Sequence, residues 1–140
     1  MKRRVLFLCT GNSCRSQLAE AIINADLGET WEAVSAGTQP AGYVHPNALR
    51  ALSEIGITFT GRSKSVDEFR DQAFNAVITV CDSAAEDCPV WLGSGKRQHI
   101  SFPDPAKATG TDDEVMAVFR RVRDDIRTQI EAALRARIDA

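Results

Sequence analysis

Apolar residues along the chain fall into two patterns, short unbroken runs and longer stretches of helical period. Residues 4–9 (RVLFLC) and 76–81 (AVITVC) show little polar alternation, which is typical of parallel strands buried on both faces. Residues 31–35 predict another strand and residues 98–102 a weaker one. The chain therefore offers four short strands for one sheet.

Helical periodicity fills the stretches between these runs. Residues 16–27 place apolar side chains on one face and then meet Gly28, a natural helix stop. A second helix is predicted from Pro46, a favoured first position, to Gly56, and a short one over residues 66–73.

The last helix is the clearest. Acidic residues at 112–114 favour its positive N-terminal end, and apolar residues then recur at spacings of three and four up to Leu134. We expect the arginines of this helix to form a solvated face: Arg120, Arg121, Arg123 and Arg127.

Strands that alternate with helices predict a single α/β domain over residues 1–140, with a four-stranded parallel sheet and helices on both faces. We expect the flavodoxin-like strand order 2-1-3-4. The 44% of hydrophobic residues are typical of a soluble globular protein, and a net charge of -2 argues against a nucleic-acid partner. The apolar run at residues 5–8 is too short for a signal peptide or a membrane span. We therefore expect a monomer of the reducing cytoplasm.

The chain has four cysteines, at positions 9, 14, 81 and 88. A static disulfide framework is disfavoured in a reducing compartment, which leaves metal binding or catalysis. Zinc sites usually pair cysteines with about two to four residues between them. Here four and six residues intervene, and no His lies close to either pair in sequence. Catalysis is the better interpretation.

Cys9 ends the first predicted strand, and a loop leads from it into the first helix at Ser16. Such a loop aims backbone N–H groups at one point, where the helix dipole also favours an anion. This field favours Cys9 as a thiolate, to which Ser16 can donate a hydrogen bond. Alternatively, Cys9 merely ends a core strand and Arg15 is a surface charge, but the strand before and the helix after disfavour this. The candidate oxyanion-binding residues are Thr10, Gly11, Asn12, Ser13, Cys14 and Arg15.

Three residues outside the loop are candidates to complete a site. Asp104 stands between two prolines, so it is either a positioned general acid or an ordinary turn residue. Cys81 ends the strand next to that of Cys9, close enough for a disulfide after a modest movement. If residues 82–88 were helical, Cys88 would lie about 10.5 Å from Cys81 and would need a rearrangement to reach it. Alternatively, Cys81 is a core residue and Cys88 an idle surface thiol.

Residues 9–20, CTGNSCRSQLAE, resemble the phosphate loop of the low-molecular-weight protein tyrosine phosphatase superfamily. Within that superfamily the chain is most similar to the thioredoxin-coupled arsenate reductases. The resemblance covers nearly the whole chain, including VSAG at 34–37, the Pro46 helix, the Cys81/Cys88 segment, FPDPA at 102–106 and FRRVRDDI at 119–126.

This resemblance implies reduction of arsenate to arsenite, for arsenic detoxification. In the implied mechanism Cys9 attacks arsenic and Asp104 protonates the departing oxygen. Cys81 and then Cys88 pass a disulfide to the surface, where thioredoxin or a related dithiol protein reduces it. Phosphate or sulfate would mimic arsenate, no tightly bound cofactor is expected, and Cys14 has a structural role or none.

Some members of this family hold a monovalent cation near the loop with an Asn, a Glu, a Ser and an Asp. Asn12, Glu20 and Ser35 match three of these residues, which implies a potassium site. The position of the Asp falls at or near Ser65, where this chain departs from the pattern.

Two other functions stay open at this point. A phosphotyrosine phosphatase would use Cys9, Arg15 and Asp104 without redox chemistry, but such enzymes usually carry aromatic residues after the Asp-Pro, where this chain has Ala106 and Lys107. A non-enzymatic redox sensor would bind phosphate or sulfate tightly and turn over slowly. The two further cysteines favour reduction.

Overall fold

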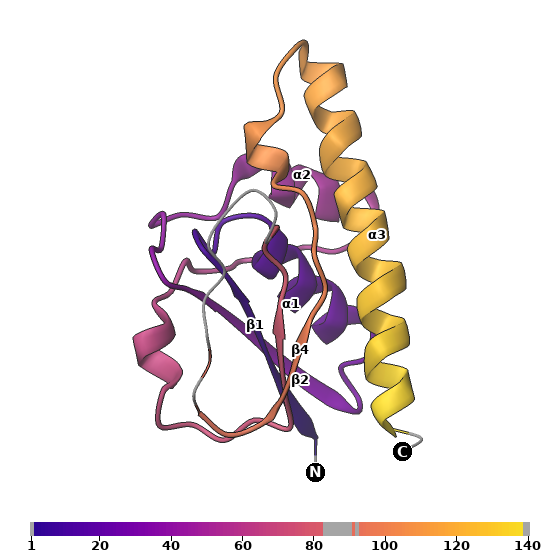
Figure 1. Cartoon of the computed structure of the whole chain (residues 1–140). Coiled ribbons are helices and arrows are strands. Elements are labelled where there is room, and N and C mark those ends of the chain that lie inside the picture. Colours follow the sequence, from indigo (N-terminus) through magenta and orange to yellow (C-terminus); the bar gives the residue numbers. More distant parts are fainter. Residues whose placement is uncertain (1, 83–90, 92, 139–140) are drawn as a thin grey trace.

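A four-stranded parallel sheet forms the centre of the computed structural model, which describes residues 2–82, 91 and 93–138 (Figure 1). The predicted strand order is confirmed, since the sheet runs β2-β1-β3-β4 with every pair parallel. The strands are β1 (Arg3–Cys9), β2 (Trp31–Gly37), β3 (Ala76–Thr79) and β4 (Lys96–His99).

The weakest predicted strand is also the one whose bounds differ most. β4 comprises Lys96–His99 rather than residues 98–102. All four of its residues are exposed, so this edge strand carries no apolar pattern from which its start could be read. Pairing with β3, not burial, defines it.

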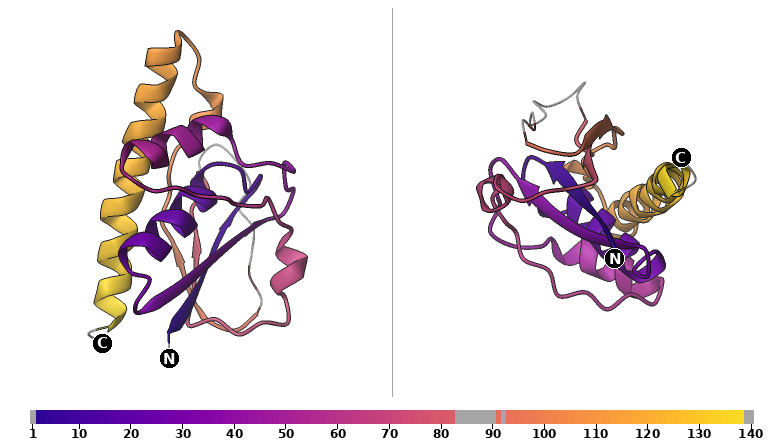
Figure 2. Two further views of the ribbon diagram at one scale, coloured as in Figure 1. Left: turned by 180° about the vertical axis from the view of Figure 1, so that it is seen from behind. Right: turned by 90° about the horizontal axis from the view of Figure 1, so that it is seen from below.

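Three α-helices lie together on one face of the sheet (Figure 2). They are α1 (Arg15–Asp26), α2 (Pro46–Glu54) and α3 (Asp112–Ile138), and each contacts the other two. In the part of the chain that the structure describes, the opposite face carries the short 3-10 helix η1 (Val66–Phe69). Helices were expected on both faces, but the two faces are unequal: one carries three α-helices and the other a single helical turn.

The helix predicted over residues 66–73 is only this one turn. Phe69 and Phe74 are both buried on the same face, with ring centroids 6.2 Å apart. A continuous helix would direct side chains five positions apart to different faces, so the chain leaves helical geometry between them.

Strand β1 divides the core into two layers. Val5, Phe7 and Cys9 face the three α-helices, whereas Leu6 and Leu8 face η1. All five are at most 2% exposed, as expected for a central parallel strand. Its last residue, Cys9, is therefore buried at the carboxyl end of a central strand.

The prediction of a fully solvated arginine face on α3 is wrong for Arg123. This residue is 8% exposed and donates to the carbonyl oxygen of Ala51 at 3.0 Å. It also pairs with Glu54 at 3.0 Å. Because α2 packs against this side of α3, the arginine finds its acceptors on a neighbouring helix rather than in water.

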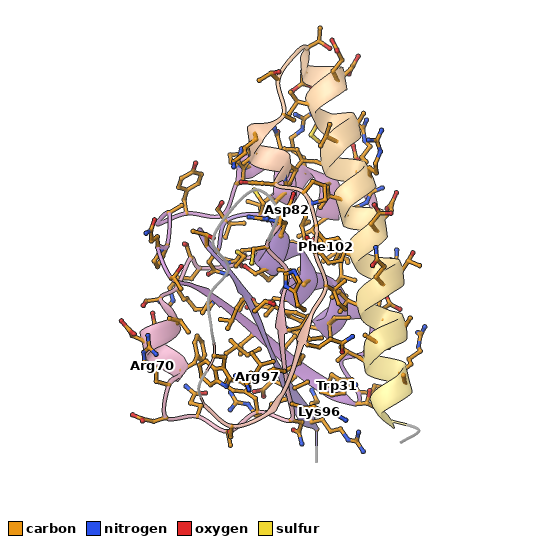
Figure 3. The ribbon with its side chains drawn as sticks, viewed as in Figure 1. Trp31, Arg70, Asp82, Lys96, Arg97 and Phe102 are labelled. Carbon is orange, nitrogen blue, oxygen red and sulfur yellow. The ribbon has the colours of Figure 1, made fainter. Side chains whose placement is uncertain are left out.

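Parallel strands bring their carboxyl ends to one edge of the sheet, which is where ligands bind in such folds. Figure 3 shows Trp31 and Lys96, the first residues of β2 and β4, at the lower end of the molecule, and Asp82 and Phe102, which follow β3 and β4, nearer the upper end. Cys9 belongs to that upper edge. Among the described residues, no helix is long and apolar enough to cross a membrane.

Candidate active site

The carbonyl oxygens of the loop after β1 accept hydrogen bonds from a neighbouring segment of the chain. Those of Thr10, Gly11 and Ser13 each accept a hydrogen bond of 2.9 Å from backbone N–H groups within residues 39–45. Because N–H and C=O point in opposite directions across a planar trans peptide, the N–H groups that follow these carbonyls point inward. The N–H of Asn12 accordingly donates to the sulfur of Cys9 at 3.2 Å. The geometry of the loop thus directs backbone N–H groups toward one thiol.

Two residues allow the loop to close so tightly. Asn12 has a φ of 48°, in the left-handed region that asparagine tolerates better than most residues. Gly37, at the end of β2, lies directly against the loop, since a Cβ there would come within 2.4 Å of the carbonyl oxygen of Thr10. A side chain at position 37 would push the loop away from the sheet.

Cys9 is held between the loop and the start of α1. Its sulfur is 2.8 Å from the hydroxyl oxygen of Ser16, and the residue is 2% exposed. The Asn12 N–H and the Ser16 hydroxyl thus both contact the sulfur where α1 begins. The thiol is therefore placed as a nucleophile at the base of a cavity.

That cavity has a volume of about 360 Å³ and is lined by Cys9, Thr10, Gly11, Asn12, Ser13, Cys14, Arg15, Asp104 and Lys107. The Arg15 guanidinium is 4% exposed and is anchored by a 3.2 Å hydrogen bond to the carbonyl oxygen of Phe102. All six loop positions predicted to bind an oxyanion line this one space.

Asp104 lines the same cavity as Cys9 but comes from the segment that follows β4. It precedes the 3-10 helix η2 (Pro105–Lys107), and its Oδ1 accepts from the N–H of Ala106 at 3.0 Å. Its Oδ2 lies 3.9 Å from the guanidinium of Arg15. One carboxylate oxygen is thus tied to the backbone while the other faces the site.

The second thiol of the loop has a different environment. Cys14 is 3% exposed, and burial raises its pKa to about 12. It therefore stays a neutral thiol at physiological pH. Of the two free cysteines among the described residues, Cys9 is the one equipped for chemistry.

Cys81 lies beside this site. Leu8 pairs with Thr79 across β1 and β3, and the N–H of Val80 donates to the carbonyl oxygen of Leu8 at 2.9 Å, so Cys81 follows directly on the strand that neighbours Cys9. Both cysteines belong to the same core cluster. Cys81 is fully buried and disulfide-bonded, whereas Cys9 is free. Cys88 lies outside the described residues.

Two residues behind the loop were missed by the sequence analysis. The Gln17 amide is fully buried and donates to both the backbone and the side-chain oxygen of Asn12. The backbone N–H of Lys64 donates to the same side-chain oxygen at 2.7 Å. A polar residue on the buried face of α1 was the available signal for Gln17. Nothing local marks Lys64, because the contact spans 52 positions.

The three residues that matched a cation site are brought together. The Ser35 hydroxyl donates to Glu20 at 2.9 Å and accepts from Asn12 at 3.0 Å. Ser65 does not take the fourth place, since its hydroxyl caps η1. Lys64 does, with its ammonium 3.4 Å from the Glu20 carboxylate. In the part of the chain that the structure describes, no group of three or more His, Cys, Asp or Glu side chains is arranged to hold a metal ion.

A buried thiol ringed by amides, with an arginine and a carboxyl group across a small cavity, defines a cysteine-dependent enzyme that acts on a tetrahedral oxyanion. The family model of the low molecular weight phosphotyrosine protein phosphatases matches residues 4–140, and the chain belongs to this family.

Individual relatives within the family are reductases. The arsenate reductase of Halalkalibacterium halodurans is 47% identical over 131 residues, which are 93% of this chain and 94% of the relative. The solved structure of an arsenate reductase in the phosphate binding state aligns with a TM-score of 0.75 and 26% identity, covering 96% of this chain and 98% of the other. A thioredoxin-dependent arsenate reductase from Corynebacterium glutamicum aligns with a TM-score of 0.62 and 25% identity, covering 96% of this chain and 63% of the other.

Proposed function

We propose that this protein reduces arsenate to arsenite by a relay through Cys9, Cys81 and Cys88. The observation that carries the proposal is the position of Cys9, a free thiol at the base of an oxyanion cavity whose neighbouring strand leads into a second cysteine. The relative from Halalkalibacterium halodurans, similar over almost its whole length, supports the same assignment.

The first step is a substitution at arsenic. The inward N–H groups and the Arg15 guanidinium bind the arsenate oxygens, as suits a planar fork of donors. The Cys9 thiolate forms the S–As bond, and Asp104 supplies a proton so that one arsenate oxygen departs as water. Arsenic remains pentavalent in this adduct.

The second step moves two electrons. The Cys81 thiolate attacks the sulfur of Cys9, the S–As bond breaks, and its electron pair stays on arsenic, which leaves as arsenite. The two cysteines are thereby oxidised to a disulfide. Cys88 then attacks Cys81 and restores the Cys9 thiolate, and an external dithiol reduces the Cys81–Cys88 disulfide. The disulfide-bonded state of Cys81 beside a free Cys9 supports such a relay.

The donor we propose is thioredoxin or a related dithiol protein, in line with the name of the Corynebacterium glutamicum structure. We further propose that the protein acts as a monomer in the reducing cytoplasm, where such donors are kept reduced.

The test is arsenate-dependent oxidation of NADPH in the presence of thioredoxin and thioredoxin reductase. Cys9→Ser, Cys81→Ser and Cys88→Ser should each abolish multiple turnover, and mass spectrometry should detect a Cys9–Cys81 disulfide only in Cys88→Ser. Cys14→Ala is the matched control, since it keeps the backbone N–H groups of the loop and removes only a thiol that stays protonated. Steady turnover by Cys81→Ser or Cys88→Ser would refute the relay.

A phosphatase activity is the second candidate, because the family and the thiol, arginine and acid of the cavity are shared with phosphotyrosine phosphatases. The described residues that line the cavity include Lys107 and no aromatic side chain, so no wall is available to stack on a phenyl ring. We expect slow hydrolysis of p-nitrophenyl phosphate at most. Brisk hydrolysis of a phosphotyrosine peptide without arsenate reduction would favour the phosphatase instead.

A further inference from the structure

A buried ion pair lies directly behind the oxyanion loop. The ammonium of Lys64 is 3.4 Å from Oε1 of Glu20 and donates to the carbonyl oxygen of Arg62 at 2.7 Å. The two charged side chains are only 9% and 12% exposed. A carboxylate this far from water requires a positive partner, and the ammonium is that partner.

Hydrogen bonds connect this pair to the nucleophile. Oε1 of Glu20 accepts from the Ser35 hydroxyl at 2.9 Å, and Ser35 accepts from the side-chain amide of Asn12 at 3.0 Å. The same amide donates to the hydroxyl oxygen of Ser16 at 2.7 Å, and that oxygen lies 2.8 Å from the sulfur of Cys9. Every link in this chain from Glu20 to Cys9 is within hydrogen-bonding distance.

The residues that matched a potassium site do not fit a cation in this arrangement. Oδ1 of Asn12 accepts from Gln17 at 2.9 Å and from the N–H of Lys64 at 2.7 Å, which occupies both of its lone pairs. Its amide group turns two N–H donors, not an oxygen, toward Ser16 and Ser35. The one carboxylate, Glu20, already has an ammonium beside it. A potassium ion would meet a positive charge and a donor where it needs oxygen ligands.

We propose that the Lys64 ammonium is a built-in replacement for a monovalent cation and positions the oxyanion loop through Glu20, Ser35 and Asn12. Lys64 is a positioning residue and touches neither the substrate nor the reacting sulfur. The order of the loop, and with it the reactivity of Cys9, is therefore independent of potassium. Only the turnover readout rests on the proposed function, because loop order and thiol reactivity are measured without arsenate.

The test compares the wild type with Lys64→Met and Lys64→Asp in potassium chloride and in tetramethylammonium chloride at equal concentration. Thermal unfolding, the rate of Cys9 alkylation by iodoacetamide and arsenate turnover are followed. Alkylation is measured in a Cys81→Ser, Cys88→Ser background, so that Cys9 is the reactive thiol. Lys96→Met is the matched control, because Lys96 is exposed and stands at the opposite end of the sheet (Figure 3).

The wild type and Lys96→Met should behave alike in both salts. Lys64→Met should lose about 5 °C or more in Tm and change the alkylation rate several-fold in either salt, because Glu20 is left without its partner. Lys64→Asp adds a carboxylate beside Glu20, so we expect potassium, and not tetramethylammonium, to raise its Tm by about 3 °C or more and to restore alkylation toward the wild-type rate.

Three results would overturn the proposal: a wild type that potassium stabilises or activates, a Lys64→Met variant indistinguishable from wild type in every readout, or a Lys64→Asp variant indifferent to potassium. If arsenate is not reduced but the stability and alkylation results are as expected, the proposed function fails while Lys64 keeps this role.

Discussion

The loop that follows β1 has two sides with different structures, one that lines a cavity and one that is buried in a hydrogen-bond network. The front side is the cavity of about 360 Å³, which Cys9, Arg15 and Asp104 line together with the rest of the loop. The back side is a buried hydrogen-bond network in which Asn12 and Gln17 are fully buried and the amide of Asn12 has a partner for every donor and acceptor. One side of this short loop therefore carries the reacting groups, and the other side holds the loop in place.

This difference separates two kinds of expected effect. A change on the front side removes a reacting group but leaves the packing intact, so it should lower the rate at nearly constant stability. A change on the back side leaves buried polar atoms without partners, so it should lower stability and rate together. The predictions below run from the largest expected effect to the smallest.

The front side is tested most directly at the acid. Asp104→Asn keeps the shape of the side chain and the hydrogen bond from Ala106 but cannot deliver a proton. We expect kcat for arsenate to fall by roughly 10² to 10⁴-fold with unchanged urea unfolding. Equal losses of stability and activity would instead place Asp104 among the structural residues.

The back side is tested at the residue on which its bonds converge. Asn12→Gly keeps the left-handed backbone but leaves the buried N–H of Lys64 without its acceptor and removes one of the acceptors of Gln17. We therefore expect a loss of about 1 to 3 kcal/mol in urea unfolding, together with slower turnover. Asn12→Ala should lose about 1 kcal/mol more, because alanine resists a φ of 48°. A stable but inactive Asn12→Gly would contradict the division into two sides.

A buried carboxyl group far from the loop in sequence is expected to affect the stability of the protein but not its activity. Glu131 lies on α3 beside Asp26, and burial together with that neighbouring carboxylate raises its pKa to about 7. Protonation therefore favours the folded state: the contribution is full below the unfolded pKa near 4.5 and is lost as pH rises through about 7.

Glu131→Gln should remove this dependence. Between pH 5 and pH 8 the wild type should lose about 1 to 3 kcal/mol relative to the variant, followed by urea unfolding at several pH values. Turnover should be the same in both proteins, because Asp26 ends α1 at the opposite end of the helix from Arg15. Parallel pH profiles of stability would show that Glu131 is ionised in the fold.

The smallest effect is expected at the second thiol of the loop. Because burial raises the pKa of Cys14 to about 12, iodoacetamide at pH 7 should label one site, Cys9, in a Cys81→Ser, Cys88→Ser background. Cys14→Ala should change turnover by less than about threefold, since no step uses this sulfur. Fast labelling of both thiols would remove the distinction between them.

Much of the fold and of the front side follows from sequence alone. The unbroken apolar run of residues 4–9 is typical of a central parallel strand, and its last residue is Cys9. A strand, a glycine-containing loop and a helix start in succession place backbone donors around that sulfur, whatever else surrounds them. Local backbone geometry determines this part of the site.

The tertiary structure decided which side chains meet across long sequence separations. Lys64 reaches Glu20 across 44 positions, and Arg123 finds Ala51 across 72, and neither pair leaves a periodic trace in the sequence. Periodicity reports which face of an element is buried, whereas the partner of a buried charge depends on how separate elements pack. For that reason the sequence alone assigned the fourth position of the cation site at or near Ser65. In the folded protein Lys64 occupies that place, with a positive charge of its own.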